Sequence, residues 1–214
     1  MYYDLTIFGI KCGEISYLYP QKNQLLITAY STGLIDYIFP FKNDYNTTFD
    51  TSFYGVQHYN KIIRQGDFKQ RLSGKWDASS KKIEYEKLES FQRPDSCMNL
   101  FTFFARLNKE QGDMLDTQWF PVEHEGNLFK SRVLIADTVK MESNGHSVLC
   151  NHFRLDLIPL NDQIKMLDRS DYFSQNITRP EAIKQVWVEQ NNARRIMKAS
   201  VKIGPVSVTA TLRQ

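Results

Sequence analysis

The stretch RPDSCMNLFTFFARLN, residues 93–108, decides the fold that we expect for this chain. Its apolar residues recur at helical spacing, whereas most of the remaining sequence alternates with the period of a β-strand. Pro94 sets the chain direction, and Asp95 or Ser96 can cap the start of a helix. The apolar face consists of Cys97, Met98, Leu100, Phe101, Phe104, Ala105 and Leu107. We predict one principal helix, about residues 95–108, whose broad apolar face other elements must cover.

The alternating segments before and after this helix predict its cover. The most regular of them are 2–8, 24–30, 56–65, 68–76, 183–189 and 206–212. In 68–76, Phe68, Leu72 and Trp76 point one way and the charged residues point the other, so one face of the sheet is exposed to water. Asn144-Gly145 supplies the positive φ that a two-residue hairpin turn requires. We count about 10–12 antiparallel strands, more than an open twisted sheet holds without curling.

The expected architecture is therefore mainly β: one large curved antiparallel sheet, or half-open barrel, wrapped around the helix. Residues 31–40 break the alternation and fit one or two helical turns at one end of the sheet. Residues 160–176 have no consistent period, and we expect a long loop there, with at most a short helix or strand. The length of 214 residues suits a single β domain, residues 1–214.

Composition excludes several classes of function. The net charge is only +3, from 27 basic and 24 acidic residues, which argues against a nucleic-acid partner. No run approaches the ~18 apolar residues of a membrane-spanning helix, so we expect no transmembrane segment. Met1 is followed directly by a strand pattern, so we expect any export leader to have been removed. Cys12, Cys97 and Cys150 are odd in number and widely spaced, which favours three buried thiols.

No catalytic motif stands out. His58, His124, His146 and His152 are scattered, which argues against a metal site, and no G-x-S-x-G elbow is present. We expect neither a cofactor nor enzymatic activity. A hydrolase that uses a pair of carboxylates stays open as a third hypothesis, because the separation that matters for such a pair is spatial.

The aromatic residues suggest a binding function. A curved sheet that does not close can leave an apolar cleft, for which the candidate ligand-binding residues are Met98, Phe101, Phe104, Trp76, Trp119 and Trp187. The alternative is that these side chains simply fill the core. On the wet face, Arg64, Lys69, Arg71 and Lys75 either meet lipid head groups or anionic glycans, or form an ordinary solvated surface.

The order of several short motifs resembles the exported bacterial family called domain of unknown function 3108. The motifs are Gly9-Ile10 with Gly13-Glu14, the Pro94-Asp95 helix to Arg106, the long hairpin through Cys150, Val186-Trp187-Val188, Arg194-Arg195 and the Gly204 hairpin. The element order is also similar to that of half-barrel lipoprotein carriers, whose sheet and helices enclose an apolar cavity. The chain departs from the family pattern at Gln190-Asn191-Asn192 and at Ile196-Met197, so no site is inferred at that turn.

This resemblance implies a periplasmic or cell-surface location but no assigned activity. Our first hypothesis is a non-enzymatic envelope protein that binds a lipid, acyl chain or other apolar small molecule between sheet and helix. The second is a structural or adaptor domain that recruits an envelope protein partner by strand addition at its sheet edges.

Overall fold

The computed structural model describes residues 1–160, 170–191 and 193–213 of the chain. The middle of the segment expected to be a loop, residues 161–169, lies outside the described residues. The strands before the principal helix are β1 (Tyr2–Ile7), β2 (Ile10–Gln21), β3 (Gln24–Ser31), β4 (Phe41–Phe49), β5 (Val56–Gln65), β6 (Phe68–Asp77), β7 (Lys82–Tyr85), β8 (Phe91–Gln92) and β9 (Met98–Asn99). Those after it are β10 (Phe120–His124), β11 (Asn127–Ser143), β12 (His146–Pro159), β13 (Ile183–Glu189), β14 (Ile196–Ile203) and β15 (Val206–Leu212).

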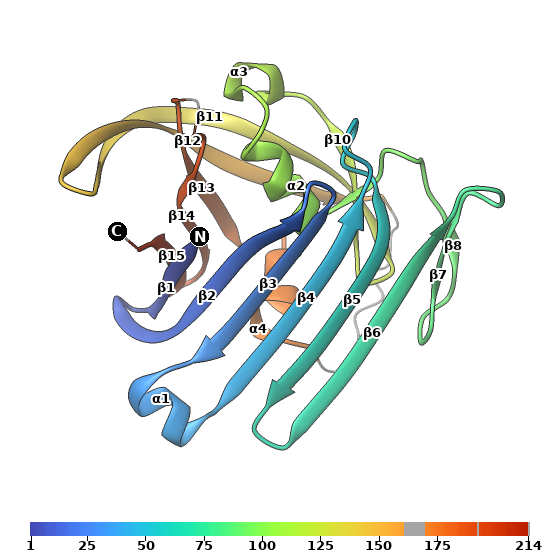
Figure 1. Ribbon diagram of the computed structural model, residues 1–214, viewed down its shortest axis with the longest axis horizontal. Coiled ribbons are helices and arrows are strands. Elements are labelled where there is room, and N and C mark those ends of the chain that lie inside the picture. Colours follow the sequence, from blue (N-terminus) through green and yellow to red (C-terminus); the bar gives the residue numbers. More distant parts are fainter. Residues whose placement is uncertain (161–169, 192, 214) are drawn as a thin grey trace.

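These strands form one curved sheet in the order β8-β7-β6-β5-β4-β3-β2-β1-β15-β14-β13-β12-β11-β10-β9. All neighbours are antiparallel except β9 and β10, and β8 and β9 are its two edges, so the sheet does not close (Figure 1). The mainly β class and the curved sheet around a helix are confirmed. The strand count exceeds the expected 10–12, because two-residue strands such as β8 and β9 are too short to leave a periodic signal in the sequence.

Pairing between the two ends of the chain makes this one sheet. β1 pairs with β2 on one side and with β15 on the other, where Tyr3 lies opposite Leu212. The N-terminus and the C-terminus therefore lie close together in the middle of the sheet (Figure 1). Asn144 and Gly145 both have positive φ, 50° and 75°, and turn β11 into β12 as expected.

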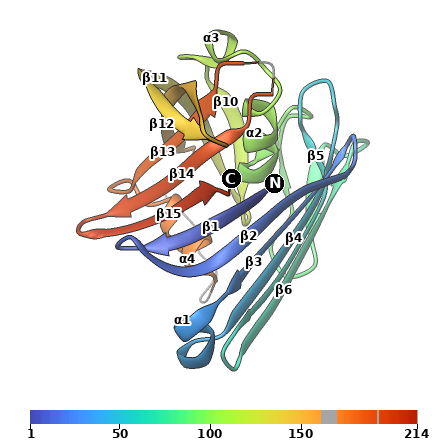
Figure 2. The same cartoon turned by 60° about the vertical axis from the view of Figure 1, so that its left-hand side comes forward.

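Helix α2 (Leu100–Leu107) lies inside the curve of the sheet (Figure 2). Six of its eight residues are buried. The helix starts at residue 100 rather than 95, and neither Asp95 nor Ser96 is its cap. Asn99 is the N-cap: its Oδ1 accepts the Thr102 N–H at 2.9 Å, and its own N–H donates to Thr102 Oγ1 at 3.1 Å. Met98 and Asn99 pair with β10, and a turn closed by the Cys97 N–H and the Pro94 carbonyl at 3.0 Å precedes them, so the helix cannot begin earlier.

The described residues form three short helices besides the principal one. Helix α1 (Gly33–Ile38) falls within the predicted helical turns at residues 31–40. Helix α3 (Gly112–Leu115) follows α2, and α4 (Tyr172–Ile177) overlaps the end of the segment 160–176, where a short helix was among the expectations. None of the helices in the described part of the chain has the length and hydropathy of a transmembrane span.

Candidate functional site

The space between α2 and the strands is filled by aromatic side chains. The Phe101 ring lies 4.7 Å from that of Tyr45 on β4, 6.2 Å from Tyr59 on β5 and 5.9 Å from Phe173 on α4, between ring centroids. Met98 is completely buried in the same core. Phe101 and Met98, two of the six predicted ligand-binding residues, therefore pack against other side chains. This is what we expect if the aromatic side chains simply fill the core.

Phe104 and Trp76 are only partly buried, although both touch the core. Phe103, which the helical pattern did not place on the apolar face, is the fully buried phenylalanine of α2 and packs 6.0 Å from the ring of Phe120. The guanidinium of Arg93 covers the Trp76 ring at 4.2 Å from its centroid. The Trp76 ring is thus occupied by a cation–π contact.

Trp119 and Trp187 do not lie with these four residues. Trp119 is 41% exposed and lies against the side chains of Lys130 and Arg132. Trp187 alternates with the buried Val186 and Val188 of β13, so its side chain is on the opposite, outer face. The alternation around Trp187 predicted a strand, but alternation alone does not determine which face of that strand packs against the core.

A buried ionic group lies deeper in the curve, and we call it the Lys61 cluster. Its members are Lys61, Glu125, Ser170, Asp171 and Ser174. Lys61 Nζ from β5 donates to Glu125, lies 2.8 Å from Asp171 Oδ2 and is 2.5 Å and 3.0 Å from the two serine hydroxyls. Lys61 has no solvent-exposed surface. One strand, the β10–β11 turn and the start of α4 are thereby held together.

Sequence reasoning missed this cluster, although a signal for it exists. In β5, Tyr59, Lys61 and Ile63 alternate with more exposed residues, so the strand pattern places a lysine on the face that is otherwise apolar. A lysine at such a position must be paired, because an unpaired buried charge is very costly. Its partners are far away in the sequence, and only the fold brings them to it.

The electrostatics of the Lys61 cluster follow from burial and charge. Burial alone would raise the pKa of Asp171, but the ammonium of Lys61 and hydrogen bonds from Lys61 and Ser174 outweigh it and hold the pKa below its usual value. Burial, together with the negative charge of Asp171, raises the pKa of Tyr45 well above its ordinary value. The side chain of Lys61 thus lies between two carboxyl groups and two hydroxyls, an arrangement that suits a structural anchor better than a general base.

A third buried carboxyl group, that of Glu123, lies close to the Lys61 cluster. The Tyr85 hydroxyl donates to Glu123 Oε1, and the Gly126 N–H donates to the same oxygen at 3.2 Å. Burial raises the pKa of Glu123. Tyr59 is 3% exposed, and its hydroxyl has no hydrogen-bond partner within the described part of the chain. Burial, followed by the charges of Glu125, Asp171 and Glu123, raises the pKa of Tyr59 well above its ordinary value.

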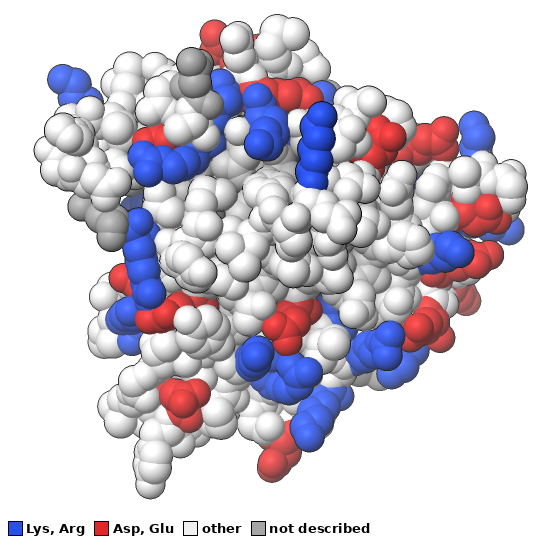
Figure 3. Space-filling view, in the orientation of Figure 1, with Lys and Arg blue, Asp and Glu red and all other residues white. Residues whose placement is uncertain are grey.

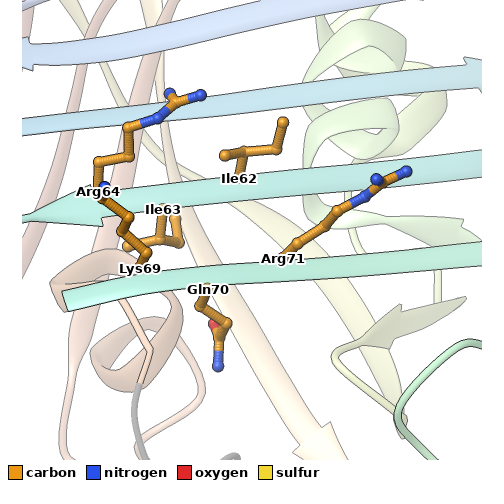
Figure 4. Close-up of a pocket in the computed structure, with 6 residues that line it drawn as sticks. All are labelled: Ile62, Ile63, Arg64, Lys69, Gln70 and Arg71. Atoms are coloured by element: carbon orange, nitrogen blue, oxygen red, sulfur yellow. The ribbon is translucent and has the colours of Figure 1, made fainter.

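The outer face of β5 and β6 carries a shallow pocket of about 280 Å³. Its lining residues are Ile62, Ile63, Arg64, Lys69, Gln70 and Arg71 (Figure 4). Arg64, Lys69 and Arg71 are exposed, as predicted for the wet face, and Figure 3 shows basic side chains gathered over this part of the sheet. The pocket therefore offers positive charge around the side chain of Ile62.

The described residues form no cluster of metal ligands and no activated cysteine. Within residues 1–160, 170–191 and 193–213, no three His, Cys, Asp or Glu side chains are arranged to hold a metal ion. All three cysteines are buried and free, as expected. Burial raises the pKa of Cys97 to about 12 and that of Cys150 to about 11, so neither thiol is activated.

The long β11–β12 hairpin presents a free strand edge. β12 pairs with β11 out to Ser143, opposite His146, whereas β10 covers β11 only from Asn127 to Ser131. An isolated bridge joins Val133 to Asp116. In the described structure, residues 137–141 of β11 thus have a strand partner on one side only. The hairpin extends away from the body of the molecule (Figure 1).

Fold and site together define an open, β-barrel-like domain. No family model and no curated protein matches the sequence. The crystal structure of a β-barrel-like protein of the domain of unknown function DUF1849 from Brucella abortus is similar, with a TM-score of 0.60 and 8% identity over 100% of this chain and 94% of that one. A DUF1089 family protein from Pseudomonas aeruginosa has a TM-score of 0.48 and 8% identity over 88% and 89% of the two chains. At this identity the first likeness shows the fold alone.

Proposed function

We propose that this protein is a non-enzymatic adaptor domain of a bacterial cell envelope, which binds a protein partner by strand addition along β11. The edge of residues 137–141, which has no strand partner on one side among the described residues, is the observation that carries the proposal, because its backbone groups can extend the sheet. The periplasmic or cell-surface location rests on the resemblance to the domain of unknown function 3108 family, and it is part of the proposal.

The composition of the edge supports a selective rather than an indiscriminate contact. Asp137 and Lys140 are exposed along it. Charged side chains on a free edge discourage pairing with arbitrary strands, since a partner must bring complementary charges. We therefore expect a partner segment of extended conformation with charges of both signs.

The partner contact can be tested with a photoreactive amino acid at Lys140, in cells that produce the protein. We expect a discrete crosslinked product in the envelope fraction. The matched control carries the same amino acid at Lys75, an exposed position on the outer face of β6, and should give no such product. Equal crosslinking from both positions, or none from Lys140, would count against strand addition at this edge.

Binding of a lipid, acyl chain or other apolar ligand is the competing proposal. Its support is the likeness to half-barrel carriers, and the packing of Met98 and Phe101 against protein argues against it. Native mass spectrometry of gently purified protein, with titration of a fluorescent fatty acid, decides between the two. We expect a ligand-free mass and no fluorescence change, whereas a bound lipid would favour the carrier.

A further inference from the structure

Helix α1 leaves an apolar surface without a partner. None of its six residues is buried, and Leu34, Tyr37 and Ile38 are 72%, 89% and 66% exposed. Phe39, directly after the helix, is 53% exposed. Exposed apolar residues are ordinary when scattered singly, but a cluster of them marks an interaction surface.

The β1–β2 turn continues this surface. Phe8 and Ile10 are 63% and 71% exposed. Helix α1 lies beside β2, since the Thr32 N–H just before the helix donates to the Cys12 carbonyl at 3.2 Å. Figures 1 and 2 both show α1 and the β1–β2 turn at the same end of the curved sheet. We call Phe8, Ile10, Leu34, Tyr37, Ile38 and Phe39 the apolar rim.

Positive charge lies next to the apolar rim. Lys42, which follows α1 on β4, is opposite Arg64 on β5, and Arg64 is opposite Lys69 on β6. Arg71, two residues after Lys69 on β6, has its side chain on the same outer face. Asp44 pairs with Arg64 at 2.9 Å, and Lys42, Lys69 and Arg71 have no ion-pair partner among the described residues. Figure 3 shows this basic row beside the largely uncharged projection formed by α1.

Two acidic side chains at this end of the molecule have no ion-pair partner among the described residues. Asp36 of α1 accepts a hydrogen bond from Ser31 Oγ at 2.5 Å, at the base of the helix. Asp67 lies in the β5–β6 turn. Even with these included, the unpaired charge on the outer face beside α1 is positive.

We propose that the apolar rim and the basic row form a docking surface for an anionic lipid bilayer. Aromatic and aliphatic side chains at one end of a protein, flanked by lysine and arginine, match the chemistry of the bilayer interface. The rim residues would enter the boundary between head groups and acyl chains, and Lys42, Lys69 and Arg71 would meet lipid phosphates. This surface is separate from β11, so the inference does not depend on the proposed partner.

Flotation with vesicles tests the inference. We expect the protein to float with vesicles that contain phosphatidylglycerol, and far less with pure phosphatidylcholine vesicles or at high salt, because salt screens the basic row. Replacing Leu34 and Ile38 together by serine should weaken binding by about tenfold or more. Lys69→Glu should weaken it by at least about fivefold. Both changes are at exposed positions, and circular dichroism should show an unchanged fold.

Two control variants match these changes at distant positions. Met114 on α3 is 62% exposed at the opposite end of the molecule, so Met114→Ser should leave flotation unchanged. Lys75→Glu reverses an exposed charge of β6 far from the rim and should have a much smaller effect than Lys69→Glu. No flotation with either vesicle, or equal losses in rim and control variants, would overturn the inference. A dimer in solution that the Leu34 and Ile38 changes dissociate, without flotation, would overturn it in favour of a second copy of the chain.

Discussion

At the scale of single residues, Lys61 best shows how the fold constrains chemistry. Its ammonium is fully buried, and its partners come from the β10–β11 turn and from the segment that leads into α4. Such pairs contribute little net stability compared with apolar residues, but removal of one partner leaves buried charges without compensation. We therefore infer that the cluster specifies where α4 and the β10–β11 turn dock.

Lys61→Met should destabilise the protein by about 3–5 kcal/mol, because Glu125 and Asp171 then remain buried without their cation. Urea unfolding followed by tryptophan fluorescence measures the change. Lys75→Met, on the outer face of the neighbouring strand, is the matched control and should change the free energy of unfolding by less than about 0.5 kcal/mol. A loss in Lys61→Met no larger than in the control would mean that the ion pairs do not form in solution.

Glu123 predicts a pH dependence of stability. Burial raises its pKa above the ordinary 4.5, so its contribution to stability is complete below pH 4.5 and is lost as pH rises through the raised pKa. Glu123→Gln keeps an acceptor for Tyr85 but cannot ionise. The free energy of unfolding of the variant, relative to the unmodified protein, should therefore increase between pH 4 and pH 8, by at most ~1.4 kcal/mol per pH unit.

Urea unfolding curves at several pH values check this expectation. Asp171 acts in the opposite direction, since its lowered pKa means that its contribution is lost only as pH falls below 3.8 towards that pKa. That loss lies outside the measured window and is common to both proteins. A constant difference between the two proteins across the window would show that Glu123 has an ordinary pKa.

At the scale of elements, the sequence pattern located several strands accurately but misplaced the start of α2. The alternation in 56–65, 183–189 and 206–212 located β5, β13 and β15 with their observed ends. The start of α2 was misplaced because Pro94 and Asp95 are good helix-start residues locally, whereas pairing of Met98 with β10 decides where the helix begins. Tertiary pairing overrode a local preference.

Phe101→Ala should destabilise the protein by about 3–5 kcal/mol, because its ring contacts strands and α4 at once and the vacated space cannot collapse fully. Thermal unfolding by circular dichroism and urea titration both measure this loss. Phe53→Ala, in a loop where the side chain is 38% exposed, is the control and should cost much less. If both variants were equally stable, α2 would not be the centre of the core.

At the scale of the whole molecule, the pairing of β1 with β15 joins the early and the late strands into one sheet. The chain also connects the two sheet edges directly, because β8 and β9 flank residues 93–97. Arg93 anchors this connection: its guanidinium donates to the Cys97 carbonyl at 2.9 Å and also to the Val56 carbonyl. The backbone of residues 93–97, which joins the two edges of the open sheet, thus helps the core to maintain the curvature of the sheet.

Truncation after Ile203 should abolish cooperative folding, because it removes β15 and leaves β1 and β14 without their shared neighbour. The expected result is a broad thermal transition by circular dichroism and a shift to aggregated species in gel filtration, since two long strand edges become free. A truncated chain that melts sharply near the temperature of the full chain would show that the two groups of strands fold independently.

The sequence by itself determined the class of this protein: period-two alternation specified the strands, and one segment of helical period specified what the sheet encloses. These are local properties, since each strand or helix must present an apolar face regardless of its neighbours. Only the tertiary structure decided which face of β13 is buried, that Trp119 is partly exposed, and which carboxyl groups contact Lys61. It also decided that the edge of β11 and the apolar rim stay open. Those features depend on pairing between residues distant in the chain, and no local period records such pairing.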